Sequence, residues 1–324
     1  MDDQTPAPDD PPRPAPDTAA QEAWSRDLGQ AHVAQFRPGN ETLIVEFESR
    51  DTVAARPEHL PWSVRQARSE GWATLTLMAD GRTWYRAPEV IDFFDEMTDE
   101  GLFDDYDRVI FLGTGVAGYG AATYSLAAPG ATVVLIAPYA TRDPALVPWE
   151  TRFHRDRALS FGPRYGYAPD ALDAAQQVYL LSDPTETPDA MHASLFRGPH
   201  ITQLPARHGG ARLRERLEAM DLLLPVVQAA AETDLTTLGW AKLWRARQHD
   251  PVWLGNLMRK LDLMDRPWLQ AVFAGEMLDA TGAEAARRRL NDALSRLQAQ
   301  GRPFPAGRKP ASPPDRDSLR MAGE

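Results

Sequence analysis

The sequence predicts an α/β fold: a mostly parallel sheet of about six strands with flanking helices, followed by C-terminal helical hairpins. Three observations predict it. Short apolar, partly β-branched runs alternate with helical patterns between residues 42 and 204. The stretch 108–138 has the pattern strand, glycine-rich turn, helix, strand, which favours a right-handed β-α-β unit. From Ala211 onward only helical patterns remain.

The first third of the chain supplies two predicted strands and their helices. Gln21–Phe36 is predicted as a short helical piece before the first strand. A glycine stop ends one predicted helix, and an amphipathic pattern marks another. In chain order we expect the strand Thr42–Phe47, the helix Ser63–Gly71, the strand Ala73–Met78, the turn Asp80–Tyr85 with two aromatic residues, and the helix Val90–Gly101.

The central stretch contains a strand at Val109–Leu112, a helix at Ala121–Ala127 and a second strand at Thr132–Ile136. Its turn can be interpreted in two ways. Gly113-x-Gly115-x-x-Gly118 matches the fingerprint of a Rossmann-type nucleotide-binding protein, in which backbone amides approach a pyrophosphate. Alternatively, the turn is a nucleophile elbow, G-x-S-x-G, with Gly115 at the serine position.

Two features favour the elbow. The fingerprint requires an acidic residue about 20 residues on, and that place falls on the apolar Ile136–Pro138. The elbow requires small residues on both sides of its strained central position, and Gly113 and Ala117 meet that requirement around Gly115.

The run Gly113–Ala122, the Asp-x-x-x-Trp-Tyr run of Asp80–Tyr85 and the aromatic loop Tyr139–Arg152 resemble the α/β-hydrolase superfamily. In particular they are similar to hydrolase-like proteins associated with bacterial exopolysaccharide and glycan biosynthesis, from which Gly115 departs at the serine. Sequences of this kind are sometimes labelled phosphoadenosine phosphosulfate reductases. That reaction uses a cysteine nucleophile, and this chain contains no cysteine.

A catalytic triad of this superfamily follows the chain order nucleophile, acid, histidine. Gly115, Asp183 and His208 keep that order, after the predicted strands Val109–Leu112, Gln177–Ser182 and His200–Leu204. Asp143 is the rival acid. The simpler alternatives are that Asp183 forms a turn before Pro184 and that His208 is an ordinary surface histidine.

Candidate binding residues lie near the same turn. The amide of Val116 is at the position that would stabilise an oxyanion. Tyr119, Tyr139 and Trp149, with Asp143, are candidates for lining a ligand cleft, although aromatic residues at strand ends more often close the core. Thr114, Tyr119 and Ser125 are the hydroxyl groups that could replace the missing serine.

Composition excludes several classes of function. The net charge of −11 argues against nucleic acid as a partner, and without cysteine there are no thiolate metal sites. The histidines lack metal-ligand spacing, so no metal and no cofactor are predicted. With no long apolar stretch and an acidic, proline-rich start, we expect no membrane span and a cytoplasmic protein.

These patterns divide the chain into a disordered tail at 1–20, an α/β-hydrolase-like domain at 21–210, a helical extension at 211–301 resembling tetratricopeptide hairpins, and a disordered tail at 302–324. In the extension, Arg212–Glu232 is predicted as one long helix, and further helices begin near Asp234, Asp250, Arg266 and Gly282.

The predicted function is non-catalytic binding of a small-molecule or glycan ligand, or of an unknown protein partner, in bacterial surface-polysaccharide biosynthesis as the resemblance implies. One alternative is an active esterase or acyl-transfer enzyme with an unusual nucleophile. The other is the nucleotide-binding protein described above.

Overall fold

The computed structural model describes residues 22–162 and 164–302. The chain divides into two compact units, Met1–Arg247 and Gln248–Glu324. The tail predicted at 1–20 lies outside the described residues, as does the tail predicted at 302–324 apart from Arg302. The division falls after Arg247 rather than after Gly210, because three further helices pack on the sheet of the first unit.

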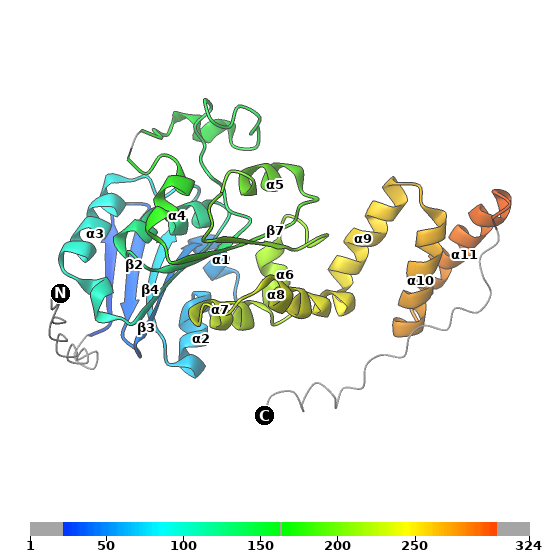
Figure 1. The fold of residues 1–324 in the computed structure, drawn as a ribbon, viewed down its shortest axis with the longest axis horizontal. Helices are drawn as coiled ribbons and strands as arrows, with labels where there is room; N and C mark the ends of the chain where they lie inside the picture. Colours follow the sequence, from blue (N-terminus) through cyan, green and yellow to red (C-terminus); the bar gives the residue numbers. More distant parts are fainter. Residues whose placement is uncertain (1–21, 163, 303–324) are drawn as a thin grey trace, which may run out of the picture. The chain divides into compact units, whose positions relative to one another are not determined.

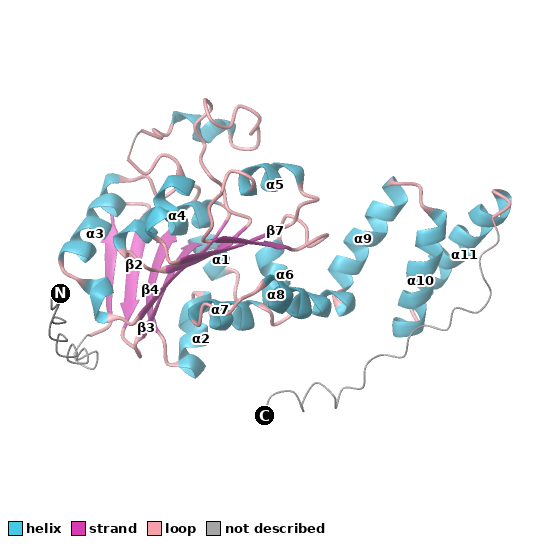
Figure 2. Ribbon diagram, in the orientation of Figure 1, coloured by secondary structure: helices cyan, strands magenta, loops and turns pink. Residues whose placement is uncertain are grey.

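The first unit is built on one eight-stranded sheet with the order β1-β2-β4-β3-β5-β6-β7-β8 (Figures 1 and 2). The strands from β3 to β8 are parallel to one another, and β2 is antiparallel to both β1 and β4. The predicted α/β class is therefore confirmed. The strands are β1 (Trp24–Leu28), β2 (His32–Arg37), β3 (Thr42–Ser49), β4 (Ala73–Ala79), β5 (Arg108–Thr114), β6 (Thr132–Ile136), β7 (Gln177–Ser182) and β8 (Ile201–Pro205).

Two of these strands were not expected. The prediction of a helical piece at Gln21–Phe36 is wrong, because this segment forms the β1–β2 hairpin with Gly29 in its turn at φ 64°. Ala34 and Phe36 are buried, and the ring of Trp24 stacks on Phe36 at 5.6 Å. Pairing with β4 and burial of apolar side chains stabilise the extended conformation, and both are tertiary effects.

Helices cover both faces of the sheet (Figure 1). On one face lie α3 (Pro88–Asp99), α4 (Val116–Tyr124) and α5 (Thr187–Ala193), and on the other lie α2 (Trp62–Glu70), α6 (Leu213–Ala219), α7 (Leu223–Ala231) and α8 (Thr237–Leu243). A short helix, α1 (Arg50–Ala54), follows β3 directly. The 3₁₀ helices are η2 (Leu102–Asp105), η3 (Ser125–Ala127), η4 (His154–Ala158), η5 (Ala168–Ala174) and η6 (Trp244–His249).

The prediction of one long helix at Arg212–Glu232 is also wrong. Asp221 has a left-handed backbone, with φ 55°, between α6 and α7. Pro225 in the first turn of α7 has no N–H, and its ring would clash with the carbonyl of residue 221 in a continuous helix. The proline therefore separates the two helices.

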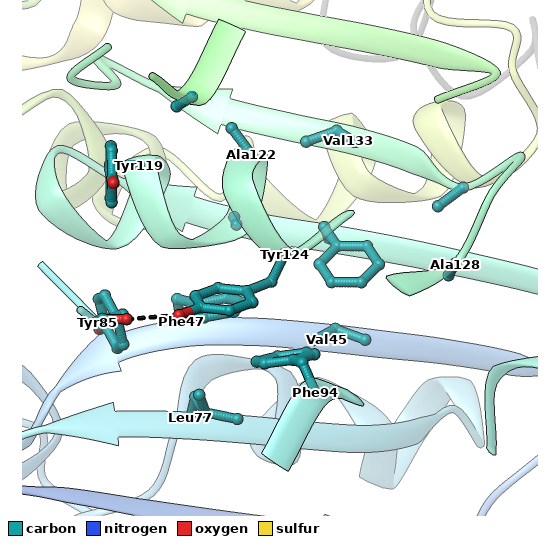
Figure 3. Close-up of a cluster of buried hydrophobic side chains, with 14 of the residues drawn as sticks. Val45, Phe47, Leu77, Tyr85, Phe94, Tyr119, Ala122, Tyr124, Ala128 and Val133 are labelled. Carbon is teal, nitrogen blue, oxygen red and sulfur yellow. Dashed lines mark hydrogen bonds between the residues drawn. The ribbon is translucent and has the colours of Figure 1, made fainter. Parts of the chain in front are cut away.

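The core between the sheet and the helices α3 and α4 is aromatic (Figure 3). The rings of Phe94 and Tyr124 stack with 4.3 Å between their centroids, and Phe47 stacks on both. The Tyr124 hydroxyl donates to the Tyr85 carbonyl at 2.6 Å, as Figure 3 shows. Gly120 leaves the room that this packing needs, since an added Cβ would lie 2.7 Å from the Phe47 ring and 2.8 Å from that of Tyr85.

The second unit contains α9 (Pro251–Leu263), α10 (Pro267–Thr281) and α11 (Glu284–Ala299). These helices begin where the sequence predicts, because Asp250 accepts a hydrogen bond from the Trp253 amide at 2.9 Å and a proline opens both α9 and α10. Ala271, Ala293 and Leu297 form the core between α10 and α11. The tetratricopeptide character stays a prediction. None of the helices described is both long and apolar enough to cross a membrane.

Candidate functional site

The turn between β5 and α4 has the backbone geometry of a sharp elbow. Gly115 has φ 56° and ψ −117°, a combination outside the regions that side chains allow. Its N–H donates to the Ile136 carbonyl at 3.0 Å. Its own carbonyl accepts from the amides of Tyr119 at 3.0 Å and Tyr139 at 3.2 Å, so the turn is held from both sides.

Close packing accounts for the flanking glycines. An added Cβ at Gly113 would lie 2.2 Å from the Ala117 carbonyl oxygen, and one at Gly118 would lie 3.1 Å from Pro138. The strand, the helix and the loop after β6 meet at this turn with no room for side chains. The glycine pattern therefore follows from the tight elbow itself and requires no bound nucleotide.

Tyr139 covers the elbow. A Cβ added at Gly115 would lie 3.4 Å from a carbon of the Tyr139 ring and 3.8 Å from its hydroxyl oxygen. The guanidinium of Arg152 lies 5.0 Å from the centre of the same ring. Burial, with the nearby Asp189 carboxylate, raises the pKa of Tyr139 to about 12, so its phenol is protonated at neutral pH.

An ionic network that the sequence analysis missed joins the partly exposed Arg152, which lies against Tyr139, to three buried residues, Glu150, Asp189 and His192. Arg152 contacts Glu150 at 2.6 Å and Asp189 at 2.6 Å, and Glu150 lies 3.1 Å from His192 Nε2. Burial opposes ionisation of Glu150, but hydrogen bonds from Arg152 outweigh it and lower the pKa of Glu150 to about 2. In the sequence, the Glu-x-Arg pattern at the end of the predicted loop Tyr139–Arg152 was the feature that could have indicated this network.

His192 in this network is structural. Its Nδ1 accepts from the Ala140 amide at 3.2 Å, so its proton lies on Nε2, which donates to Glu150. Burial lowers the pKa of His192 to about 4, and the ring is neutral at pH 7. Because both ring nitrogens are engaged, His192 has no nitrogen left to act as a base on a substrate at the elbow.

The structure places Asp183 and His208 at the ends of the expected strands. Asp183 is buried after β7, where Oδ1 accepts from the amide of Thr185 at 2.9 Å and its hydroxyl at 2.8 Å, and Oδ2 accepts from the Gly210 amide at 2.9 Å. Asp183 thus connects the turn after β7 to the loop that carries His208, a residue with φ 64°. A direct Asp183–His208 hydrogen bond stays a prediction.

The other predicted residues divide between core and surface. Tyr119 donates to the Tyr165 carbonyl and contacts Arg86, so its hydroxyl is part of the core. Trp149 is half-buried, with its ring 4.7 Å from that of His192. Asp143 accepts from the Ala145 amide at 2.8 Å within its own loop. Ser125 donates to the Ala122 carbonyl at 2.8 Å.

A cleft with a volume of ≈ 580 Å³ adjoins the elbow, and ligand sites typically measure roughly 300–1,000 Å³. It lies at the carboxyl ends of β3 and β5, where the chain leaves neighbouring strands toward opposite sides of the sheet. Open α/β sheets bind ligands at such a switch point. Its lining includes Glu48, Arg56, Tyr85, Thr114, Val116 and Arg214.

Buried charges form one wall of this cleft, and the sequence analysis missed them as well. Arg56 contacts both oxygens of Glu48 at 2.6 Å, and Arg214 contacts Glu46 at 2.5 Å and Glu48 at 2.8 Å. Glu218 bridges the two arginines, at 2.9 Å from Arg214 and 3.1 Å from Arg56.

Burial, with the neighbouring Glu48 carboxylate, raises the pKa of Glu46 to about 7. The signal in the sequence was a pair of acidic residues at alternate positions, Glu46 within the predicted strand Thr42–Phe47 and Glu48 directly after it, which in a continued strand lie on one face.

No family model and no curated protein matches the chain. Among solved structures, the capsule O-acetyltransferase of Neisseria meningitidis serogroup A is 12% identical over 62% of this chain and 93% of that one, with a TM-score of 0.41. An esterase domain from a Rhodothermus marinus protein is 12% identical over 61% and 99%, with a TM-score of 0.38.

The Glycosylation Associate Protein (Gap123) complex from Streptococcus agalactiae is 13% identical over 66% of this chain and 47% of that one, with a TM-score of 0.43. Similarities of this size say nothing about activity. The parallel sheet and the elbow after β5 are themselves the features of an α/β-hydrolase-like fold.

Proposed function

We propose that this protein is a non-catalytic α/β-hydrolase-like protein that binds a ligand or a protein partner. The observation that carries the proposal is the elbow itself. Gly115 occupies the position of the nucleophile, in the backbone conformation of an elbow, and has no side-chain atom that could attack a carbonyl. The Tyr139 ring lies against the place where a nucleophile and its substrate would meet.

The surrounding groups support the same proposal. The hydroxyls of Tyr119 and Ser125 each donate to a backbone carbonyl, so neither is aligned to attack a substrate at the elbow. Tyr139 carries a raised pKa, so its phenolate is scarce at neutral pH. Both carboxylate oxygens of Asp183, the candidate acid, accept hydrogen bonds, one from the Thr185 amide and the other from the Gly210 amide.

In this proposal the cleft beside the elbow is the ligand site. Its mixed lining of carboxylates, guanidinium groups and hydroxyls suits a polar ligand with both donors and acceptors, and a glycan is one such ligand. A role in bacterial surface-polysaccharide biosynthesis belongs to the proposal through the resemblance of the Gly113–Ala122 run.

Labelling with a fluorophosphonate, together with hydrolysis of p-nitrophenyl acetate, tests the absence of catalysis. We expect no labelling and no turnover above buffer. Labelling mapped to a residue of the cleft would overturn the proposal. Addition of NAD, FAD or ATP should leave the melting temperature unchanged, whereas a rise would favour the nucleotide-binding alternative.

One observation favours the alternative of an active esterase or acyl-transfer enzyme. Thr114 lines the cleft next to the elbow, and its hydroxyl oxygen is buried and has no hydrogen-bond partner among the residues that the structure describes. If the wild type does hydrolyse activated esters, Thr114→Val should abolish the activity, while Thr123→Val on the neighbouring helix should preserve it.

A further inference from the structure

The two edges of the sheet differ in how they are covered. At one edge, β8 ends in Pro205, and the Trp240 indole of α8 donates to the Pro205 carbonyl at 3.0 Å. At the other edge, Ser25, Arg26 and Asp27 of β1 are exposed. No strand within residues 22–162 and 164–302 pairs with the outer side of β1. Its outward N–H and C=O groups are therefore able to pair with an added strand.

A groove runs beside this open edge. It has a volume of ≈ 380 Å³ and an apolar part formed by Trp24, Phe36, Met97 and Leu102. Its polar part consists of Glu22, Glu96, Glu100, Asp105 and Arg26. Arg26 already contacts Glu96 at 2.7 Å, so the groove carries an excess of negative charge.

The helix beside the groove extends this charge. From residue 87 to residue 107, which covers α3 and η2, the chain has no lysine or arginine and nine acidic residues, namely Glu89, Asp92, Asp95, Glu96, Asp99, Glu100, Asp104, Asp105 and Asp107. None of the nine is buried. Such a face attracts cationic partners and repels acidic ones.

We propose that β1 and this groove bind a basic, extended segment of a partner protein. The segment adds a strand to β1, places an apolar side chain against Trp24 and Leu102, and positions lysine or arginine residues beside Glu22 and Glu100. The chain's own residues 1–21 are a poor occupant, because they contain five aspartates and one arginine.

Fluorescence anisotropy with a labelled peptide, Lys-Val-Arg-Leu-Lys-Val-Arg, tests this inference on the full chain. We expect saturable binding that weakens as salt is raised from 50 to 300 mM, and much weaker binding of the acidic counterpart Glu-Val-Asp-Leu-Glu-Val-Asp. Glu22→Lys combined with Glu100→Lys should weaken binding about tenfold or more. Glu41→Lys combined with Asp173→Lys, which makes the same change in net charge away from the groove, should change it less than about twofold.

Hydrogen exchange distinguishes strand addition from loose attachment to an acidic surface. The peptide should slow exchange of the β1 amides, residues 24–28. Equal weakening by both double variants, or binding without protection of β1, would overturn the inference. So would tighter peptide binding after deletion of residues 303–324, because the chain's own C-terminal segment would then be the occupant. If the protein forms a dimer and the peptide dissociates it, then β1 binds a second copy of this chain, and the inference is overturned.

Discussion

At the scale of single residues, Gly115 and Tyr139 determine what the elbow can do. Glycine adopts φ 56° and ψ −117° without strain, whereas any other residue there would have a strained backbone. Tyr139 fills the space in front of it. Under the proposed function, the elbow keeps its backbone geometry without a side chain that could attack a substrate.

Gly115→Ser should lower the free energy of unfolding by about 1–3 kcal/mol, because the side chain restores backbone strain and contacts the Tyr139 ring. Gly130→Ser is the matched comparison, since Gly130 also has a positive φ, 87°, but an added Cβ there meets no atom within 4 Å. Urea unfolding should show a smaller loss for Gly130→Ser. A Gly115→Ser protein that is more stable than wild type would mean that the turn is not an elbow.

The same variant tests whether His208 is a vestigial base. Serine at the elbow supplies a hydroxyl, and we expect slow acylation by p-nitrophenyl acetate, detected by mass spectrometry of the intact protein. Adding His208→Ala should abolish acylation, and adding His154→Ala, an exposed histidine, should not. Acylation that persists without His208 would remove this residue from the site.

At the scale of elements, β3 has two different faces. Phe47 packs in the aromatic core with α3 and α4, whereas Glu46 and Glu48 meet Arg56 and α6 on the opposite face. A central strand with buried carboxylates is stable only when guanidinium groups compensate them. Helix α6 supplies Arg214, so this ionic cluster fixes where α6 docks.

Glu46→Gln should change how stability depends on pH. Folding raises the pKa of Glu46 from 4.5 to about 7. A carboxyl group whose pKa rises on folding stabilises the protein below its unfolded pKa and loses that contribution as the pH rises to 7. Between pH 5 and pH 8 the wild type should therefore lose about 1–3 kcal/mol relative to Glu46→Gln. The groups that act on Glu46 are Glu48, Ser63, Tyr85 and Arg214, and Arg56 and Glu218 pair with Glu48 and Arg214 in the same cluster.

Urea unfolding at pH 5, 6, 7 and 8 measures this difference. Glu41→Gln, an exposed carboxyl group, is the control and should follow the wild-type profile. Parallel profiles for the wild type and Glu46→Gln would show that Glu46 is ionised throughout this range.

Arg214→Met should destabilise the first unit by about 3–5 kcal/mol, because it leaves the buried Glu46 carboxylate without a guanidinium partner and the Glu48 carboxylate with Arg56 alone. Combining it with Glu46→Gln removes one of those carboxylates. The double variant should therefore be more stable than the sum of the two single losses predicts, by about 1–3 kcal/mol in a double-mutant cycle. Additive losses would mean that Arg214 and Glu46 are not coupled.

At the scale of the whole molecule, the boundary after Arg247 separates two units with their own cores. Helices α6, α7 and α8 belong to the first unit, since Leu213, Leu217, Val226 and Val227 are buried there and Trp240 binds the end of β8. The ionic cluster around Arg214 and the covering of the sheet edge at β8 both depend on helices α6 to α8.

Residues 1–247 should therefore form a monomer that melts cooperatively, as measured by size-exclusion chromatography and circular dichroism. Residues 1–210 should aggregate, because that fragment loses Arg214 and exposes the apolar face that α6 and α7 cover. A soluble, cooperatively melting 1–210 fragment would instead support a domain boundary at Gly210.

The sequence by itself determined the features that local patterns encode. Apolar runs and glycine stops located the central strands and α2, helical patterns beginning near Asp250 and Arg266 located the starts of α9 and α10, and the small residues around Gly115 identified the elbow. These features depend on neighbours within a few residues, which the sequence shows directly.

The tertiary structure decided the rest, because the forces responsible act between residues far apart in the chain. Pairing with β4 makes β2 a strand where local pattern favours a helix. Arg214 meets Glu46, and Asp189 meets Arg152, only once the sheet has formed. Burial then sets the pKa values of Glu46 and His192, and no local pattern reveals which carboxylate or imidazole will be taken out of water.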